Sequence, residues 1–293
     1  MRMSYITEIQ KYMPGYIALK TNRTTSRLLD GSYMSVLKGR SMNFDELRDY
    51  VPGDDIKDMD WKASARSRKL LVRQYVAEKK HNVMFVFDTN RRMLGQTQGL
   101  EEKCHLALLS GGGAAYLVNR NGDYVSAVFA SPKTLQYFPF KTGLGNIETI
   151  LSHVRRATTL DNTTTVNTAL DYILRNFRRK MLIVIVTDLQ GAMEIKDETM
   201  KRLLVSNDLF FLLTQDVGLD GKKLYSVSRQ TYLPAYFARD KKLKKRVNQK
   251  KEKLEGELTR RLNRLGVPGV FVNENEQIYE KLTELFRRKC GER

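Results

Sequence analysis

Short, fully apolar segments alternate with amphipathic segments along much of the chain. Val83–Phe87 and Met181–Val186 are continuous apolar runs rich in β-branched residues, and aspartates follow them closely at Asp88 and Asp188. Runs of this kind are typical of strands that are buried on both faces. The pattern predicts further strands at Leu70–Val76, Tyr124–Ala130, Leu209–Leu213 and Gly269–Val272.

Amphipathic segments with helical spacing separate most of these strands. Helices are expected near Ile6–Tyr12, Leu100–Asn119, Asn146–Arg156, Val166–Arg178, Glu198–Val205 and Ile278–Arg288. Alternation of apolar strands with helices predicts an α/β fold with a doubly wound, mainly parallel sheet. Ligands of such sheets bind at the carboxyl ends of the strands, where Asp88 and Asp188 are expected to lie.

Two regions depart from this alternation and define the expected organisation. Residues 1–80 are predicted to form an N-terminal segment, and residues 81–293 the α/β domain. A basic helical insertion is expected at about residues 236–266, because its leucines recur at helical spacing. It either docks on the domain through those leucines, with its charged face in solvent, or presents a charged docking surface.

Composition narrows the class of protein. Of 293 residues 41% are hydrophobic, which fits a globular chain with a buried core. No apolar run approaches the roughly 20 residues that span a bilayer, no secretory signal is evident, and the two cysteines suggest no disulfide framework. We therefore expect a cytoplasmic protein. The net charge of +18 leaves nucleic acid, anionic lipid and an acidic protein open as partners.

The loops after the apolar strands carry oxygen ligands suited to a hard cation such as Mg²⁺. They contain Asp88 with Asn90, Thr164, and Asp188. This arrangement resembles the metal-ion-dependent adhesion site of von Willebrand factor A domains, in which an aspartate is followed by serines at +2 and +4. Arg92 stands at the second serine position, and its guanidinium is a cation without an acceptor. Arg92 is therefore expected to repel a metal, or to replace it by pairing with Asp88 or Asp188.

The segment before the α/β domain carries a more specific motif. After Phe44 it contains Arg48-Asp49-Tyr50-Val51-Pro52-Gly53-Asp54, then Asp60-Trp61, Ala65-Arg66, Val72-Arg73 and Glu78. This pattern resembles the signature of the bacterial family called domain of unknown function 58. The site residues that the resemblance marks are Arg48, Tyr50, Pro52, Gly53, Asp54, Asp60, Trp61, Arg66, Arg73 and Glu78.

The resemblance implies a von Willebrand factor A-like domain and a partnership with a MoxR-type AAA+ ATPase, beside which many members are encoded. Some members have two N-terminal membrane helices, whereas this chain resembles a short cytoplasmic form. Two interpretations of the signature stay open. It is either an ion-paired brace, with Trp61 anchored against the sheet domain, or a recognition surface for the ATPase.

These observations favour a non-enzymatic adaptor that works with a MoxR-type ATPase and client proteins in the assembly or maturation of complexes. No catalytic residue and no cofactor are predicted, with Mg²⁺ at the strand-end site as the alternative. A phosphate-binding Gly-x-x-x-x-Gly-Lys-Ser/Thr loop is missing from the sequence, so ATP hydrolysis is not expected. The competing hypotheses are a nucleic-acid-binding protein that uses its basic surface, and a divalent-metal-dependent hydrolase at Asp88 and Asp188.

Overall fold

The computed structural model describes residues 4–13, 46–74, 80–97, 101–215, 225–227, 230–232 and 240–290. A six-stranded sheet forms its centre, in the order β10-β7-β6-β3-β4-β5. The strands are β3 (Asn82–Phe87), β4 (Tyr124–Ala130), β5 (Leu135–Lys141), β6 (Leu182–Asp188), β7 (Asp208–Thr214) and β10 (Gly269–Phe271). All neighbouring pairs are parallel except β4 and β5. The predicted doubly wound, mainly parallel α/β fold is thus confirmed.

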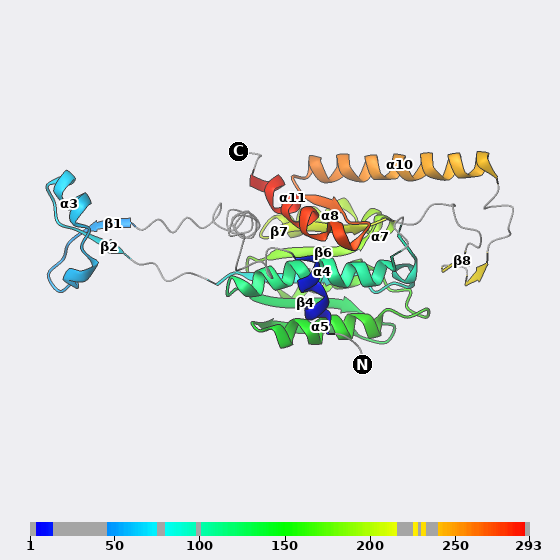
Figure 1. The fold of residues 1–293 in the computed structure, drawn as a ribbon, viewed down its shortest axis with the longest axis horizontal. Helices are drawn as coiled ribbons and strands as arrows, with labels where there is room; N and C mark the ends of the chain where they lie inside the picture. The colour runs from blue at the N-terminus through cyan, green and yellow to red at the C-terminus, as the bar shows by residue number, and fades with distance from the viewer. Residues whose placement is uncertain are drawn as a thin grey trace.

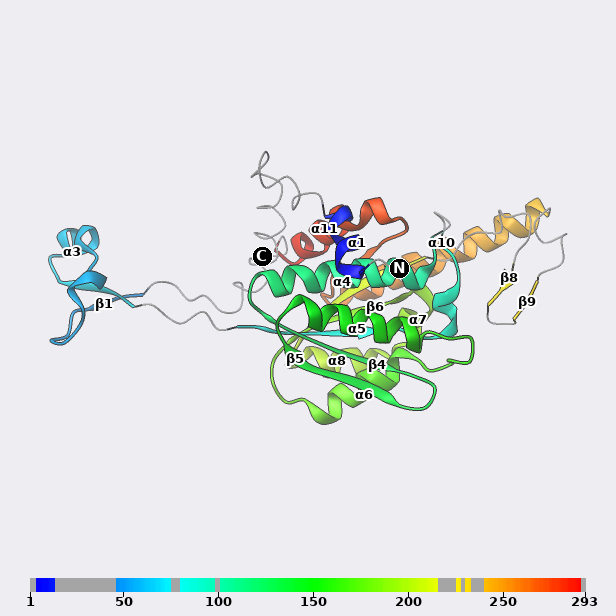
Figure 2. The same ribbon diagram turned by 60° about the horizontal axis from the view of Figure 1, so that its bottom comes forward.

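Helices cover both faces of the sheet (Figures 1 and 2). One face packs against α1 (Tyr5–Tyr12), α4 (Lys103–Arg120), α5 (Leu144–Ala157) and α11 (Ile278–Cys290). The other packs against α6 (Val166–Asn176), α7 (Leu189–Glu194), α8 (Asp197–Leu204) and α10 (Lys241–Arg264). Because both faces are covered, every residue of β6 is buried, which is why its sequence is an unbroken apolar run.

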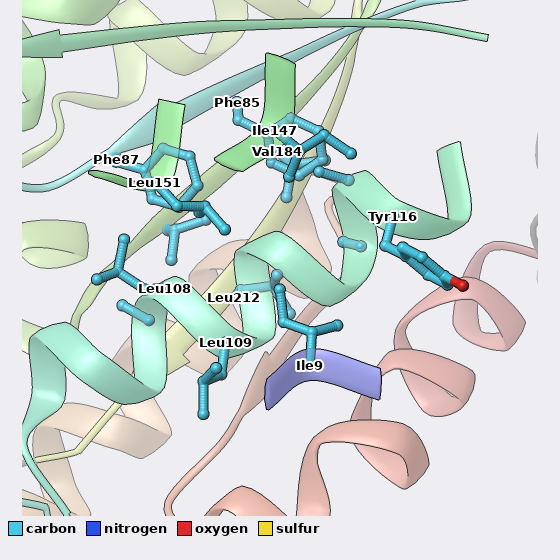
Figure 3. Close-up of a cluster of buried hydrophobic side chains, with 14 of the residues drawn as sticks. Ile9, Phe85, Phe87, Leu108, Leu109, Tyr116, Ile147, Leu151, Val184 and Leu212 are labelled. Atoms are coloured by element: carbon cyan, nitrogen blue, oxygen red, sulfur yellow. The ribbon is translucent and has the colours of Figure 1, made fainter. Parts of the chain in front are cut away.

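Helix α4 is the most deeply buried helix of the first layer, and it lies close to the sheet (Figure 3). A Cβ atom on Gly111 would lie 2.6 Å from the Phe87 ring, and one on Gly112 would lie 2.5 Å from Ile9. Gly111 and Gly112 therefore permit close helix packing, because a methyl group at either position would overlap a neighbouring side chain.

Strand β5 at one edge of the sheet and helix α7 beside it were not predicted from the sequence. Strand β5 forms an antiparallel hairpin with β4, and its residues alternate between half-buried and exposed positions. Helix α7 begins directly after β6, and the Asp188 side chain caps it by accepting from Gly191 N. The other predicted helices and strands within the described residues are present, with bounds that differ by a few residues.

The basic insertion forms the long helix α10, as predicted. Its C-terminal half docks on the body, because Leu258 and Leu262 are buried and Arg261 bonds to Asp197. Its N-terminal half continues past the body in both views (Figures 1 and 2). In the described part of the chain, no helix is both long and apolar enough to cross a membrane.

Residues 46–74, which we call the signature unit, form a small two-stranded structure of their own. Strand β1 (Glu46–Asp49) pairs antiparallel with β2 (Leu71–Gln74), and between them lie η1 (Ile56–Asp58) and α3 (Trp61–Ser67). Its aspartates organise the connections: Asp54 accepts from Val51 N across the Pro52-Gly53 turn, and Asp60 caps α3 by accepting from Ala63 N. Gly53 has φ +114°, which favours glycine at that position.

Candidate functional site

The carboxyl ends of β3 and β6 lie side by side at the centre of the sheet. The two strands pair in parallel, with Phe87 opposite Val186. Between them the strand order changes direction, and such a switch point opens a crevice where doubly wound proteins bind ligands. Asp88 and Asp188 both lie at this point, as the sequence predicted, and both are buried.

Both oxygens of the Asp88 carboxylate are engaged by neighbouring groups. Oδ1 accepts from Asn90 N at 2.9 Å, and Oδ2 accepts from Thr187 Oγ1 at 2.7 Å. Arg92 Nη2 lies 3.4 Å from the same Oδ2. The carboxylate is therefore held by a backbone amide, a hydroxyl and a guanidinium.

Asp188 pairs with a lysine that the sequence analysis missed. Lys103 is the first residue of α4, its side chain is 1% exposed, and its Nζ lies 2.8 Å from Asp188 Oδ2. Asp188 Oδ1 accepts from Gly191 N at 2.7 Å. One signal was available in the sequence: a lysine at the start of an otherwise almost wholly apolar helix needs a buried anionic partner.

Arg92 lies between three carboxylates and is only 12% exposed. Besides its contact with Asp88, its Nε is 3.6 Å from Asp188 Oδ2, and its Nη1 is 3.4 Å from Glu194 Oε1 at the margin. The guanidinium thus pairs with both strand-end aspartates. We call Asp88, Arg92, Lys103 and Asp188 the sheet-top cluster.

The other two predicted ligands lie beside this cluster and bond mainly to the loops. Asn90 donates from Nδ2 to Thr164 O at 2.8 Å, while its Oδ1 accepts from Arg92 N at 3.0 Å. The Thr164 hydroxyl donates to Asn162 Oδ1 at 2.6 Å and lies 3.2 Å from Ala130 O. The fully buried Asn162 is a second residue that sequence reasoning missed, and it ties the Thr164 loop to the end of β4.

The two aspartates differ in their affinity for a proton. Burial and then the Asp188 charge raise the pKa of Asp88 to about 6, against the opposing effects of Arg92 and Thr187. Burial also acts to raise the pKa of Asp188, but the charges of Lys103 and Arg92 and the hydrogen bonds together lower it below its ordinary value. Asp188 is therefore the more firmly ionised partner.

The backbone of helix α7 packs directly against the cluster. A Cβ atom on Gly191 would lie 2.1 Å from Thr187 Oγ1 and 2.6 Å from Asp88 Oδ2. A glycine at this position therefore lets the helix backbone approach the carboxylate closely.

The donor set of the cluster matches a hard divalent cation poorly. Mg²⁺ takes about six oxygen ligands in octahedral geometry, whereas the oxygens of Asp88 and Asp188 already accept from amides, a hydroxyl, an ammonium and a guanidinium. Within the described residues, no group of three or more His, Cys, Asp or Glu side chains could hold a metal ion. Asp88, Asp188 and Glu194 converge on the Arg92 guanidinium rather than on an open metal position, so the arrangement expected of a metal-dependent hydrolase is not seen there.

The signature unit places its tryptophan on the outside. Trp61 is 61% exposed at the start of α3, so the expectation that it anchors the segment against the sheet domain is wrong. Arg66, Pro52 and Gly53 are also exposed, and Tyr50 donates its backbone N–H to Leu70 O. Glu78 lies outside the described residues, and for Arg48 and Arg73 only the backbone is described, in β1 and β2.

The signature unit exposes several large apolar side chains. Nine large apolar side chains are exposed in the described residues, and five of them belong to the signature unit. These five are Leu47, Val51, Ile56, Trp61 and Leu70. Exposed large apolar side chains are thus concentrated in this short stretch of the chain, and exposed apolar surface often marks a binding site.

Comparison with known proteins agrees with the sequence resemblance. The family model described as "Protein of unknown function DUF58" matches residues 46–207, which is more than half of the chain. The uncharacterized protein Mb1516 of Mycobacterium bovis is 26% identical over 180 residues, or 60% of this chain; the match spans 56% of that relative's length.

Two solved structures match the chain weakly, with low sequence identity and TM-scores below 0.5. The conserved hypothetical protein BatB from Bacteroides thetaiotaomicron is 12% identical with a TM-score of 0.45, over 71% of this chain and 98% of that one. A von Willebrand factor type A protein from Catenulispora acidiphila is 7% identical with a TM-score of 0.41, over 75% of this chain and 44% of that one.

Proposed function

Because the chain belongs to the family described as "Protein of unknown function DUF58", we propose that it is a non-enzymatic adaptor whose signature unit binds a partner protein. The partner that the family resemblance implies is a MoxR-type AAA+ ATPase, and the adaptor would link it to client proteins during assembly or maturation of a complex. The α/β domain would serve as the folded platform that carries this unit.

The observation that carries the proposal is the exposed apolar surface of the signature unit. Ile56 is 64% exposed and Trp61 61% exposed, although burial of such side chains is favourable by about 1.5–3 kcal/mol each. Aromatic residues in particular are common anchors at protein interfaces. The unit's own fold rests on Val72 and on capped turns, so these outward side chains are available for a partner.

Affinity capture of the tagged full chain from its native organism tests the proposal. We expect a MoxR-type ATPase to be recovered with the wild type and lost with the double variant Ile56→Ser/Trp61→Ser. The matched control is Leu160→Ser/Val205→Ser, which removes two exposed apolar side chains from the α/β body and should still capture the ATPase. Absence of the ATPase from the wild-type capture, or its equal loss with the control variant, would contradict the proposal.

A second candidate function, nucleic-acid binding, is favoured by the N-terminal half of α10. Residues 241–253 carry eight Lys or Arg and one acidic residue, Glu252. Lysines spread around a helix suit sequence-independent contacts with phosphates, whose affinity falls steeply with salt. Fluorescence anisotropy with a labelled DNA duplex should then show binding at low salt that Lys244→Glu/Lys245→Glu weakens, and an absence of binding at low salt would remove this candidate.

A further inference from the structure

The sheet-top cluster compensates the repulsion between two carboxylates that the fold brings together. Asp88 and Asp188 end neighbouring parallel strands, so two carboxylates are brought together in the interior with almost no access to water. Two like charges in that position are strongly unfavourable unless cations compensate them. The repulsion can be relieved by a bound metal ion, by cations of the chain itself, or by protonation of one carboxylate.

We propose that Arg92 and Lys103 are a built-in pair of cations that stands in place of a divalent metal ion at this sheet end. Lys103 Nζ contacts Asp188 at 2.8 Å, and the Arg92 guanidinium bridges Asp88 and Asp188 at 3.4 and 3.6 Å. Two single positive charges supply the charge that one divalent ion would carry. The protein therefore holds its strand-end aspartates together without a metal.

The surrounding packing holds the side chains of Lys103 and Arg92 against the two aspartates. Lys103 is fixed by its position at the start of α4, where its backbone N–H donates to Gly95 O at 2.8 Å. The Gly191 backbone of α7 lies close to Asp88 and Arg92, since a Cβ atom on Gly191 would be 2.6 Å from Asp88 Oδ2 and 3.2 Å from Arg92 Nη2. Cations that are covalently part of the chain do not dissociate, so the stability of the protein has no metal-concentration dependence at this site. A divalent ion would also meet the repulsion of two buried cations.

The consequence is that removal of both cations should create a metal site where the wild type has none. Arg92→Ser/Lys103→Ser leaves both carboxylates, adds two hydroxyl groups and opens space for an ion and its waters. The matched control is Arg91→Ser/Lys196→Ser, which removes one arginine and one lysine at positions outside the cluster. The full-length chain is used throughout.

Thermal unfolding with EDTA, with millimolar Mg²⁺ or with millimolar Mn²⁺ is the test. For the wild type and the control variant we expect melting temperatures that are the same in all three conditions. The Arg92→Ser/Lys103→Ser variant should melt lower in EDTA and gain about 3 °C or more with Mn²⁺. A folded double variant that is indifferent to both ions would overturn the proposal.

A direct titration keeps the proposal testable even if the double variant does not fold. Mn²⁺ binding is followed by electron paramagnetic resonance of the free ion, in the wild type and in Asp188→Asn. We expect both proteins to bind the same amount of Mn²⁺, because the wild type has no site that depends on Asp188. A micromolar Mn²⁺ site in the wild type that disappears in Asp188→Asn would overturn the proposal, because the aspartates would then hold a metal beside the two cations. This result bears only on the cluster and leaves the proposed role of the signature unit to its own test.

Discussion

In the signature unit large apolar side chains are exposed, whereas in the sheet-top cluster charged side chains are buried. Both regions reverse the usual distribution, in which apolar side chains are inside and charges outside. Trp61 and Lys103 illustrate the contrast, with exposed fractions of 61% and 1%. The described residues leave these apolar side chains exposed, which supports the proposed partner, while the buried charges pair with one another, which points to internal stabilisation.

The two regions should also respond differently to substitution. An exposed apolar side chain contributes little to the stability of its own chain, so its loss is felt in binding. A buried ion is different, because removing its partner leaves an uncompensated charge in the interior. Stability and binding measurements on matched variants therefore separate the two roles.

The largest effect on stability is expected for Lys103→Met. This change leaves Asp188 buried without its ammonium partner, so the free energy of unfolding should fall by about 3–5 kcal/mol. Denaturant unfolding of the full chain measures it. The control is Lys242→Met on the exposed face of α10, which should change stability by less than about 0.5 kcal/mol. Equal effects of the two changes would contradict the internal role of Lys103.

A smaller loss is expected for Gly191→Ala. The added methyl group would collide with Thr187 and Asp88, and relief of that overlap should cost about 1–3 kcal/mol. Gly256→Ala is the matched control, since nothing lies within 4 Å of a Cβ atom there and the position is inside helix α10. That substitution should stabilise the protein by about 0.5–1 kcal/mol. A lowered melting temperature for Gly191→Ala together with a raised one for Gly256→Ala would support the conclusion that no space is left around Gly191.

Val72→Ala tests whether the signature unit is stabilised separately from the sheet domain. Val72 is buried within the unit, so shortening it should destabilise β1, β2 and α3 by about 1–2 kcal/mol. We expect amide hydrogen exchange to accelerate in residues 46–74 and to stay unchanged in β3 and α4. Acceleration of the same size in both regions would show instead that they unfold as one unit.

The smallest effect on stability is expected for Trp61→Ser. Because the side chain is largely exposed, its removal should shift the free energy of unfolding by no more than about 0.5 kcal/mol. Unfolding of the purified chain checks this value, and capture of the partner should fall at the same time. A large loss of stability would show instead that Trp61 stabilises the fold, as the sequence first suggested.

Much of the fold could be predicted from local patterns. β3 and β6 are unbroken apolar runs because helices cover both of their faces, and such runs are visible in the sequence. β5 was missed because it contains Pro139, and a proline argues against a hydrogen-bonded strand. It is a strand because β4 supplies its hydrogen-bonding partner.

The sequence by itself determined the α/β class, the positions of Asp88 and Asp188 at strand ends, and the presence of an arginine where a metal ligand was expected. Only the tertiary structure decided that Lys103 completes the cluster and that Trp61 faces outward. Periodicity reports which faces of a local segment are apolar. Whether a charge is buried depends on a partner that lies far away in sequence, 85 positions in the case of Lys103 and Asp188.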